Sequence, residues 1–412
     1  MRRRWEWVVA AGVMLSSLSA CEGPPQLSAD KMGDLTYVLA ERTRPDVEHL
    51  ARCGSGALTD TGRRVLRRAP YLQRVDTAST WVMFTAATGN AVTVDVTRPD
   101  GRAVDSVSAV PDTSARTAAG TWQGLAQLQG LEPDTLYCYA LRGMTARAGF
   151  RTAPSGGGSR PVRFIAFGDS GDGGVYQYTV ARQMLTAPFD FMLHTGDVAY
   201  DDGTRAQLEK GFFGVYAGTI RSFPAFLVAG NHDYATDDGA PFRQVFALPD
   251  NKTGKGVERW YSFDWGNAHF VALDSERIGG EQVAWLEADL AATSQPWKIV
   301  FAHHPPFSSG EHGSDIDFRR HFLPVIQRHG VALVLSGHDH HYERSKPQGG
   351  TTYIVTGGGG HGTREVGQGD FTQFSVETLH FVQVEVHESE LFVHAIDGTG
   401  VEFDSARIGL GE

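Results

Sequence analysis

The sequence VRFIAFGDSG at residues 162–171 is an apolar run of strand length that ends in glycine and a carboxylate, Asp169. Similar apolar runs recur further along the chain, at residues 189–193, 225–229, 269–273, 299–302 and 331–335. Segments with helical spacing or length lie between them, at residues 174–187, 206–216, 281–292 and 317–329. Because strands that alternate with helices build layered domains, we expect an α/β domain with its functional site at strand ends.

Polar motifs follow five of these runs: GDSG at 168–171, GDVAY at 196–200, GNHD at 230–233, AHHP at 302–305 and GHDH at 337–340. One Gly-Asp or Asn-His pair is typical of a turn, but five motifs in order, each after an apolar strand, indicate one shared site. Carboxylate, carboxamide and imidazole groups together suit iron, zinc or manganese. Cysteine is absent from the set, which argues against a structural zinc knot. We therefore predict a metal site.

The length and the net charge of the chain limit the classes of function that are possible. The chain has 412 residues, which is enough for two domains with their own cores. Its formal net charge of -11 argues against a nucleic acid as the main partner, because binding to that backbone uses Lys and Arg. A phosphate ester remains compatible, because bound metal ions supply positive charge locally.

Residues 67–153 contain short strands between turn residues, such as WVMF at 81–84 and VTVDV at 92–96. The stretch LEPDTLYCY at 131–139 resembles the late strand and tyrosine corner of fibronectin type III sandwiches. The resemblance implies a small all-β sandwich, which we expect to act as a spacer or rim domain. A Gly/Ser-rich linker at 154–161 separates it from a catalytic domain at 162–400.

Residues 1–20 are typical of an export signal: arginines precede an apolar run that is too short to span a membrane comfortably. The sequence LSAC at 18–21 resembles the lipobox of bacterial lipoproteins. The resemblance implies cleavage before Cys21 and a lipid anchor on it; the alternative is an ordinary signal peptide cut nearby. We expect a tether and N-terminal segment over 21–66 and a location in the bacterial cell envelope, in the periplasm or on the outer surface.

Export would place Cys53 and Cys138 in an oxidising compartment. Two remaining cysteines there favour a disulfide over a metal site, the alternative being two unpaired thiols.

The five motifs together resemble the metallophosphoesterases, and within them the purple acid phosphatases. The resemblance covers residues 162 to about 396, and GHDHHYERS at 337–345 is close to the family motif G-H-x-H-x-Y-E-R. Gly171 stands where most metallophosphoesterases have a histidine, and Tyr200 stands where purple acid phosphatases carry a tyrosinate ligand. The alternative for Tyr200 is a buried structural tyrosine. The resemblance implies a four-layer αββα metallophosphoesterase sandwich behind a fibronectin type III-like domain.

The resemblance also implies a ligand set. Fe(III) would be held by Asp169, Tyr200 and His340, a divalent Zn, Fe or Mn ion by Asn231, His303 and His338, and both ions by Asp197. A phenolate favours a trivalent ion and implies visible charge-transfer colour. The implied chemistry is attack on phosphorus by a metal-bound hydroxide, in line with the leaving group.

Three further histidines are candidates for contact with substrate. His232 follows Asn231 and is the candidate proton donor to the leaving group, with an orienting role as the alternative. His304 and His312 are candidates for contact with phosphate, with ordinary loop histidines as the alternative. We thus expect an acid phosphatase-like hydrolase of phosphate monoesters. A phosphodiesterase or nucleotidase on the same scaffold is the alternative, and a non-catalytic envelope binding lipoprotein would have no need for seven ligand-type residues in order.

Overall fold

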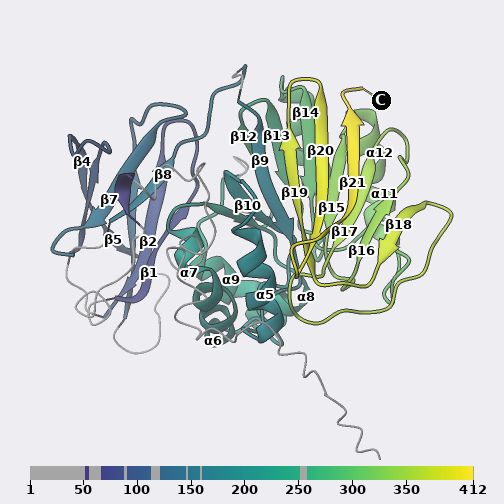
Figure 1. Ribbon diagram of the computed structural model, residues 1–412, viewed down its shortest axis with the longest axis horizontal. Coiled ribbons are helices and arrows are strands. Elements are labelled where there is room, and N and C mark those ends of the chain that lie inside the picture. The colour runs from purple at the N-terminus through teal and green to yellow at the C-terminus, as the bar shows by residue number, and fades with distance from the viewer. Residues whose placement is uncertain are drawn as a thin grey trace, which may run out of the picture.

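The computed structural model describes residues 52–54, 66–87, 91–112, 121–144, 147–157, 160–250 and 258–411. The predicted export signal, Cys21 and most of the predicted tether lie outside these residues. Within the described part of the chain, no helix is long and apolar enough to cross a membrane. An all-β sandwich lies at one end of the molecule, beside a larger domain of sheets and helices (Figure 1).

The sandwich consists of two four-stranded antiparallel sheets. One has the order β1 (Leu66–Gln73), β2 (Thr80–Ala86), β6 (Trp122–Leu128), β5 (Val110–Asp112). The other has the order β4 (Ala103–Ser108), β3 (Thr93–Thr97), β7 (Leu136–Leu141), β8 (Arg147–Arg151). The hydroxyl of Tyr137 accepts a hydrogen bond from the N–H of Glu132 at 2.8 Å, the backbone contact expected at a tyrosine corner. The likeness to fibronectin type III domains stays a prediction.

A disulfide joins Cys53 to Cys138 of β7, with the two Cα atoms 5.3 Å apart. The predicted pairing is confirmed, and it ties the segment before the sandwich to the sandwich's central strands.

Two mixed sheets form the larger domain. The first has the order β11 (Ala225–Leu227), β10 (Phe191–His194), β9 (Val162–Phe167), β19 (His380–Val386), β20 (Glu390–Asp397), β21 (Glu402–Gly409). The second has the order β12 (Tyr261–Trp265), β13 (Ala268–Ala272), β14 (Trp297–Phe301), β15 (Leu333–Ser336), β17 (Thr352–Thr356), β16 (Tyr342–Ser345), β18 (Thr372–Val376). Strands β9–β11 run parallel to one another, as do β13, β14, β15 and β17.

The two sheets pack face to face with helices on their outer faces. Phe164 of β9 meets Phe270 of β13 edge to face, with ring centroids 5.3 Å apart. Helix α5 (Val175–Met184) packs against β19 on the first sheet. The second sheet packs with α10 (Gly280–Ala292), α11 (Ile316–His321) and α12 (Leu323–Arg328) around a separate apolar cluster that includes Leu286 and Phe318. The expected four-layer αββα sandwich is therefore confirmed.

Some elements differ from those expected. The helix predicted at 206–216 is divided into α6 (Arg205–Leu208), a π-helical turn (Glu209–Phe213) and α7 (Gly214–Ile220). The helix predicted at 317–329 is divided into α11 and α12, because Pro324 lies in the first turn of α12, where a helix tolerates proline. The first sheet also continues through β21, past the domain end expected at residue 400, because this strand is a largely polar edge strand without an apolar run.

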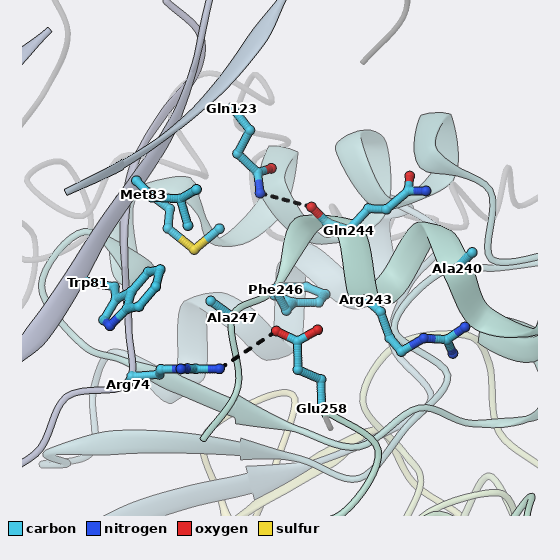
Figure 2. Close-up of a pocket in the computed structure, with 11 residues that line it drawn as sticks. Arg74, Trp81, Met83, Gln123, Ala240, Arg243, Gln244, Phe246, Ala247 and Glu258 are labelled. Atoms are coloured by element: carbon cyan, nitrogen blue, oxygen red, sulfur yellow. Dashed lines mark hydrogen bonds and ion pairs between the residues drawn. The ribbon is translucent and has the colours of Figure 1, made fainter. Parts of the chain in front are cut away.

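The sandwich packs directly on the larger domain. Arg68 of β1 is buried, makes an ion pair with Glu209 of the π-helical turn, and lies over the ring of Phe213 at 3.7 Å. A cavity of about 340 Å³ lies at this interface. Figure 2 shows the residues that line it, among them Gln123, which donates to the carbonyl oxygen of Gln244 at 2.8 Å. Gln244 lies in α9 (Ala240–Val245). Strand β1 is thus fixed against the helices beside the first sheet.

Candidate metal centre

The five polar motifs meet at one edge of the double sheet. Their residues directly follow the parallel strands β9, β10 and β11 of one sheet and β14 and β15 of the other. The N–H of Gly168, after β9, donates to the carbonyl oxygen of Thr356 at the end of β17 at 2.9 Å, which joins the two sheets at this edge. The site therefore lies at the carboxyl ends of the strands, as the sequence predicts.

Three of the predicted ligands have left-handed backbone conformations: Asp169 (φ 57°), Asp197 (φ 53°) and His338 (φ 69°). Such conformations are uncommon for residues other than glycine, although Asp tolerates them better than most, and they concentrate at functional sites. They let the chain turn sharply at the strand ends. The turn at His338 directs its N–H to the carboxylate of Asp169 at 2.9 Å.

One group of side chains surrounds the hydroxyl of Tyr200, which is buried. This oxygen lies 3.1 Å from Oδ1 of Asp169, 2.8 Å from Oδ2 of Asp197 and 3.1 Å from Nε2 of His340. The three residues predicted to hold a ferric ion are thus in mutual contact, and Asp197 contacts Tyr200.

A second group surrounds the amide oxygen of Asn231, in α8 (Asn231–Tyr234). This oxygen lies 3.0 Å from Nε2 of His303 and 3.1 Å from Nδ1 of His338. Nε2 of His303 is also 3.5 Å from Oδ2 of Asp197. The same carboxylate oxygen therefore faces both groups, which is the position that a bridging ligand requires.

The donor set fits cations. Nδ1 of His303 donates its hydrogen to the carbonyl oxygen of Thr195 at 2.9 Å, which leaves only a lone pair on Nε2. That lone pair faces the oxygens of Asn231 and Asp197, which are themselves acceptors. Ligand atoms of Asp169, Asp197 and His303 all lie within 4.8 Å of one another. Buried acceptors that converge without a hydrogen between them favour a positive ion.

The pKa shifts of the ligand side chains also favour a bound cation. Burial, followed by the charge of Asp197, raises the pKa of Asp169 well above its usual value. Burial, followed by the charge of Arg364, lowers the pKa of His340 to about 3. Burial and the nearby carboxylates raise the pKa of Tyr200 well above its usual value. Ionising these carboxyl and phenol groups therefore needs a strong positive charge beside them, and high-valent metal ions supply it.

The missing imidazole at Gly171 has a steric explanation. A Cβ at this position would lie 1.9 Å from the carbonyl oxygen of Val198. The N–H of Tyr200 donates to the carbonyl oxygen of Gly171 at 2.8 Å. The segment that carries Tyr200 therefore occupies the space that a side chain at 171 would need. The position of Tyr200 thus requires a glycine at 171.

The three candidate substrate contacts lie beside the ligands. The N–H of His232 donates to Asp197 at 3.0 Å, and its Nε2 is 4.0 Å from the same carboxylate, with the ring one-third exposed. The rings of His304 and His312 lie 4.5 and 4.1 Å from the ring of His338. Nε2 of His304 is 3.4 Å from Glu276, whose pKa burial and the charge of Asp274 raise to about 7.

Two further residues of the site carry no clear signal in the sequence. The imidazole of His361 stacks on the ring of Tyr200, and the backbone N–H of His361 donates to the carbonyl oxygen of Asp169 at 2.9 Å. The side chain of Arg364 contacts His312, and the backbone N–H of Arg364 donates to the carbonyl oxygen of His340 at 3.0 Å. Both lie in the loop after the glycine run at 357–360, where the only hint is a histidine in a glycine-rich segment.

Residues 162–342, which include the seven predicted ligands, match the family described as calcineurin-like phosphoesterase. This domain belongs to the calcineurin-like phosphoesterases. An uncharacterized protein of Mycobacterium tuberculosis is 30% identical over 268 residues, which are 54% of this chain and 50% of that protein. The chain thus spans about half the length of this relative. Purple acid phosphatase 3 of Arabidopsis thaliana is 28% identical over 279 residues, which are 58% of this chain and 75% of the plant protein.

The fold is that of a purple acid phosphatase from yellow lupin (Lupinus luteus) seeds. The two structures superpose with a TM-score of 0.72 at 22% identity, over 82% of this chain and 74% of the lupin chain. The likeness extends beyond the phosphoesterase domain, since residues 162–411 alone would not reach that share of the chain.

Proposed function

We propose that the protein hydrolyses phosphate monoesters at a dinuclear metal centre of the purple acid phosphatase type. The observation that carries the proposal is the contact of the Tyr200 hydroxyl with Asp169, Asp197 and His340, in a site where Gly171 leaves no room for an imidazole. The names of plant relatives, purple acid phosphatases 3 and 21, support the same reaction.

The residues divide into two ion sites that share one carboxylate. Asp169, Tyr200 and His340 would hold a trivalent iron ion, because phenolate and carboxylate are hard, anionic ligands. Asn231, His303 and His338 would hold a divalent ion, and Asp197 would contact both. Bound there, the ions would neutralise charge on the phosphate and lower the pKa of water.

His232 would supply the proton that the departing ester oxygen needs. Its Nδ1 donates to the carbonyl oxygen of Asp201 at 2.5 Å, which fixes the ring and directs Nε2 toward Asp197. A proton on Nε2 would move to the leaving oxygen as the bond from phosphorus to that oxygen breaks.

The test is hydrolysis of 4-nitrophenyl phosphate by protein loaded with iron and zinc, compared with metal-free protein, from acid to alkaline pH. We expect turnover that depends on both metals, with an acid optimum and a coloured protein. Metal-dependent hydrolysis of a diester with no action on the monoester would instead support the phosphodiesterase alternative. Absence of hydrolysis by fully loaded protein would overturn the proposal.

A further inference from the structure

The loop after β17 places a guanidinium group beside the metal ligands. The backbone of Arg364 is held by a hydrogen bond from its backbone N–H to the carbonyl oxygen of His340. Its terminal Nη1 lies 3.1 Å from Nδ1 and 3.2 Å from Nε2 of His312, whose ring packs on His338. The guanidinium is therefore held on the side of the site where the two histidines of the last motif lie.

His312 serves as an acceptor for this guanidinium. Asp339 is buried, and its Oδ1 lies 2.9 Å from Nδ1 of His312 and accepts from the N–H of His312 at 3.0 Å. Ser308 also donates to Asp339. Because a carboxylate only accepts, the hydrogen on Nδ1 faces Asp339, and Nε2 is the ring nitrogen that can accept from Arg364. The chain Ser308–Asp339–His312 thus fixes the position of Arg364.

Most donors of Arg364 remain available to a ligand. Its ion pair with Glu311 joins Nε to a carboxylate oxygen 3.6 Å away, and the Glu311 side chain is 69% exposed. An ion pair of this length and exposure is weak. The Arg364 side chain is itself 33% exposed, so a ligand in the site can replace that contact.

We propose that Arg364 is the residue that binds the phosphate group of the substrate and makes the enzyme prefer monoesters to diesters. This inference rests on the proposed function. A guanidinium binds two oxygens of a phosphate with parallel hydrogen bonds. A monoester offers three non-ester oxygens and up to two negative charges, whereas a diester offers two such oxygens and one charge. Loss of Arg364 therefore weakens recognition of monoesters far more than of diesters, and His312 acts as a positioning residue.

The experiment compares the wild type with Arg364→Gln and Arg364→Lys, all loaded with iron and zinc, on 4-nitrophenyl phosphate and bis(4-nitrophenyl) phosphate. We expect Arg364→Gln to lower kcat/KM for the monoester by about 10- to 100-fold, the usual effect of losing hydrogen bonds to a charged group, and that for the diester by less than about threefold. Arg364→Lys should recover only part of the loss, because it keeps the charge and lacks the planar fork. Arg320→Gln, which removes an exposed helix arginine paired with Asp317, is the matched control and should change neither substrate.

Calorimetric titration with inorganic phosphate tests the contact without turnover. Arg364→Gln should weaken phosphate binding by a similar factor while metal content stays unchanged. Equal losses on the two esters, or unchanged phosphate affinity, would overturn the role of Arg364. If the wild type hydrolyses neither ester, the proposed function fails instead, and the phosphate titration still decides whether Arg364 binds phosphate.

Discussion

The imidazole of His361 lies flat on the ring of Tyr200, with centroids 3.6 Å apart and an angle of 8° between the planes. His361 is further held near Asp172, with Nδ1 3.6 Å from the carboxylate. The phenol that would bind iron therefore has its orientation fixed by a stacked ring. Such support of a metal ligand normally changes metal affinity when it is removed.

We expect His361→Ala to shift or broaden the visible band of the iron-loaded protein and to lower iron retention about 10-fold. His361→Phe is the matched control, because it keeps a stacking ring without the polar nitrogens. Absorption spectra and iron content after dialysis provide the measurement. An unchanged spectrum in the alanine variant would show that the stacking has no effect on the ligand.

Tyr200→Phe removes the phenol oxygen and keeps the ring. The expected result is loss of the visible band, because the colour requires a phenolate bound to iron. Folding should survive, since the ring still packs between its neighbours, and near-ultraviolet circular dichroism checks this. A coloured Phe variant would rule out Tyr200 as the chromophoric ligand.

Asp197→Asn should remove both metals, because the carboxylate faces both groups of ligands. We expect activity to fall by roughly 100-fold or more. Metal analysis of the purified variant measures the loss directly. Asp404→Asn, which changes a carboxylate paired with Arg344, is the control and should keep both ions. Full metal occupancy in the Asp197→Asn variant would mean that the ions lie elsewhere.

Away from the site, His269 of β13 joins Asp264 at 2.6 Å and Asp289 of α10 at 2.8 Å. Burial opposes protonation of this ring, but the hydrogen bonds with Asp264 and Asp289 outweigh it and raise the pKa of His269 to about 9. A raised pKa in the folded state stabilises the protein below the unfolded pKa of about 6.5, and this contribution disappears as pH rises through about 9.

His269→Gln should therefore lower the free energy of unfolding by about 3 kcal/mol at pH 6 and by much less near pH 10. Denaturant titrations at the two pH values measure the difference. His394→Gln, at a more exposed ion pair in β20, is the control and should change stability by about 0.5 kcal/mol or less. A loss that is the same at both pH values would refute a charged His269.

The predicted lipid anchor can be tested in a bacterial host. Cells that express the wild type should incorporate labelled fatty acid into the protein, and Cys21→Ala should abolish the label because it removes the acceptor thiol. Ser28→Ala, seven residues downstream, should label fully. Labelling of the Cys21→Ala variant would contradict anchoring at this residue.

The sequence predicted best those features that depend on residues close to one another in the chain. Each predicted ligand lies in a motif that follows an apolar run, so an α/β domain with its site at strand ends could be inferred from the order of residues alone. The disulfide was favoured by the two remaining cysteines together with the predicted export, with two unpaired thiols as the alternative. The four layers came from resemblance to a family, because alternation alone does not specify how many sheets a chain forms.

The roles of His361 and Arg364 could not be predicted, because they depend on where the loop that carries these residues lies in the folded protein. The loop that carries them is separated from Tyr200 by more than 150 residues, and no periodicity marks it. Likewise, no pattern in the sequence marks the π-helical turn whose Glu209 pairs with Arg68.

Arg68 and Glu209 are 141 positions apart in the chain. A ribosome makes the sandwich first, so Arg68 has no counter-charge until the later segment has emerged. The sandwich then meets its partner surface on the same polypeptide, at a high effective concentration. If the chain were cut in the linker, Arg68 would lie on one fragment, and Glu209 and Phe213, which it contacts, would lie on the other. The two domains are therefore expected to fold as one cooperative unit. Proteolytic cleavage between them should release no independently stable fragment.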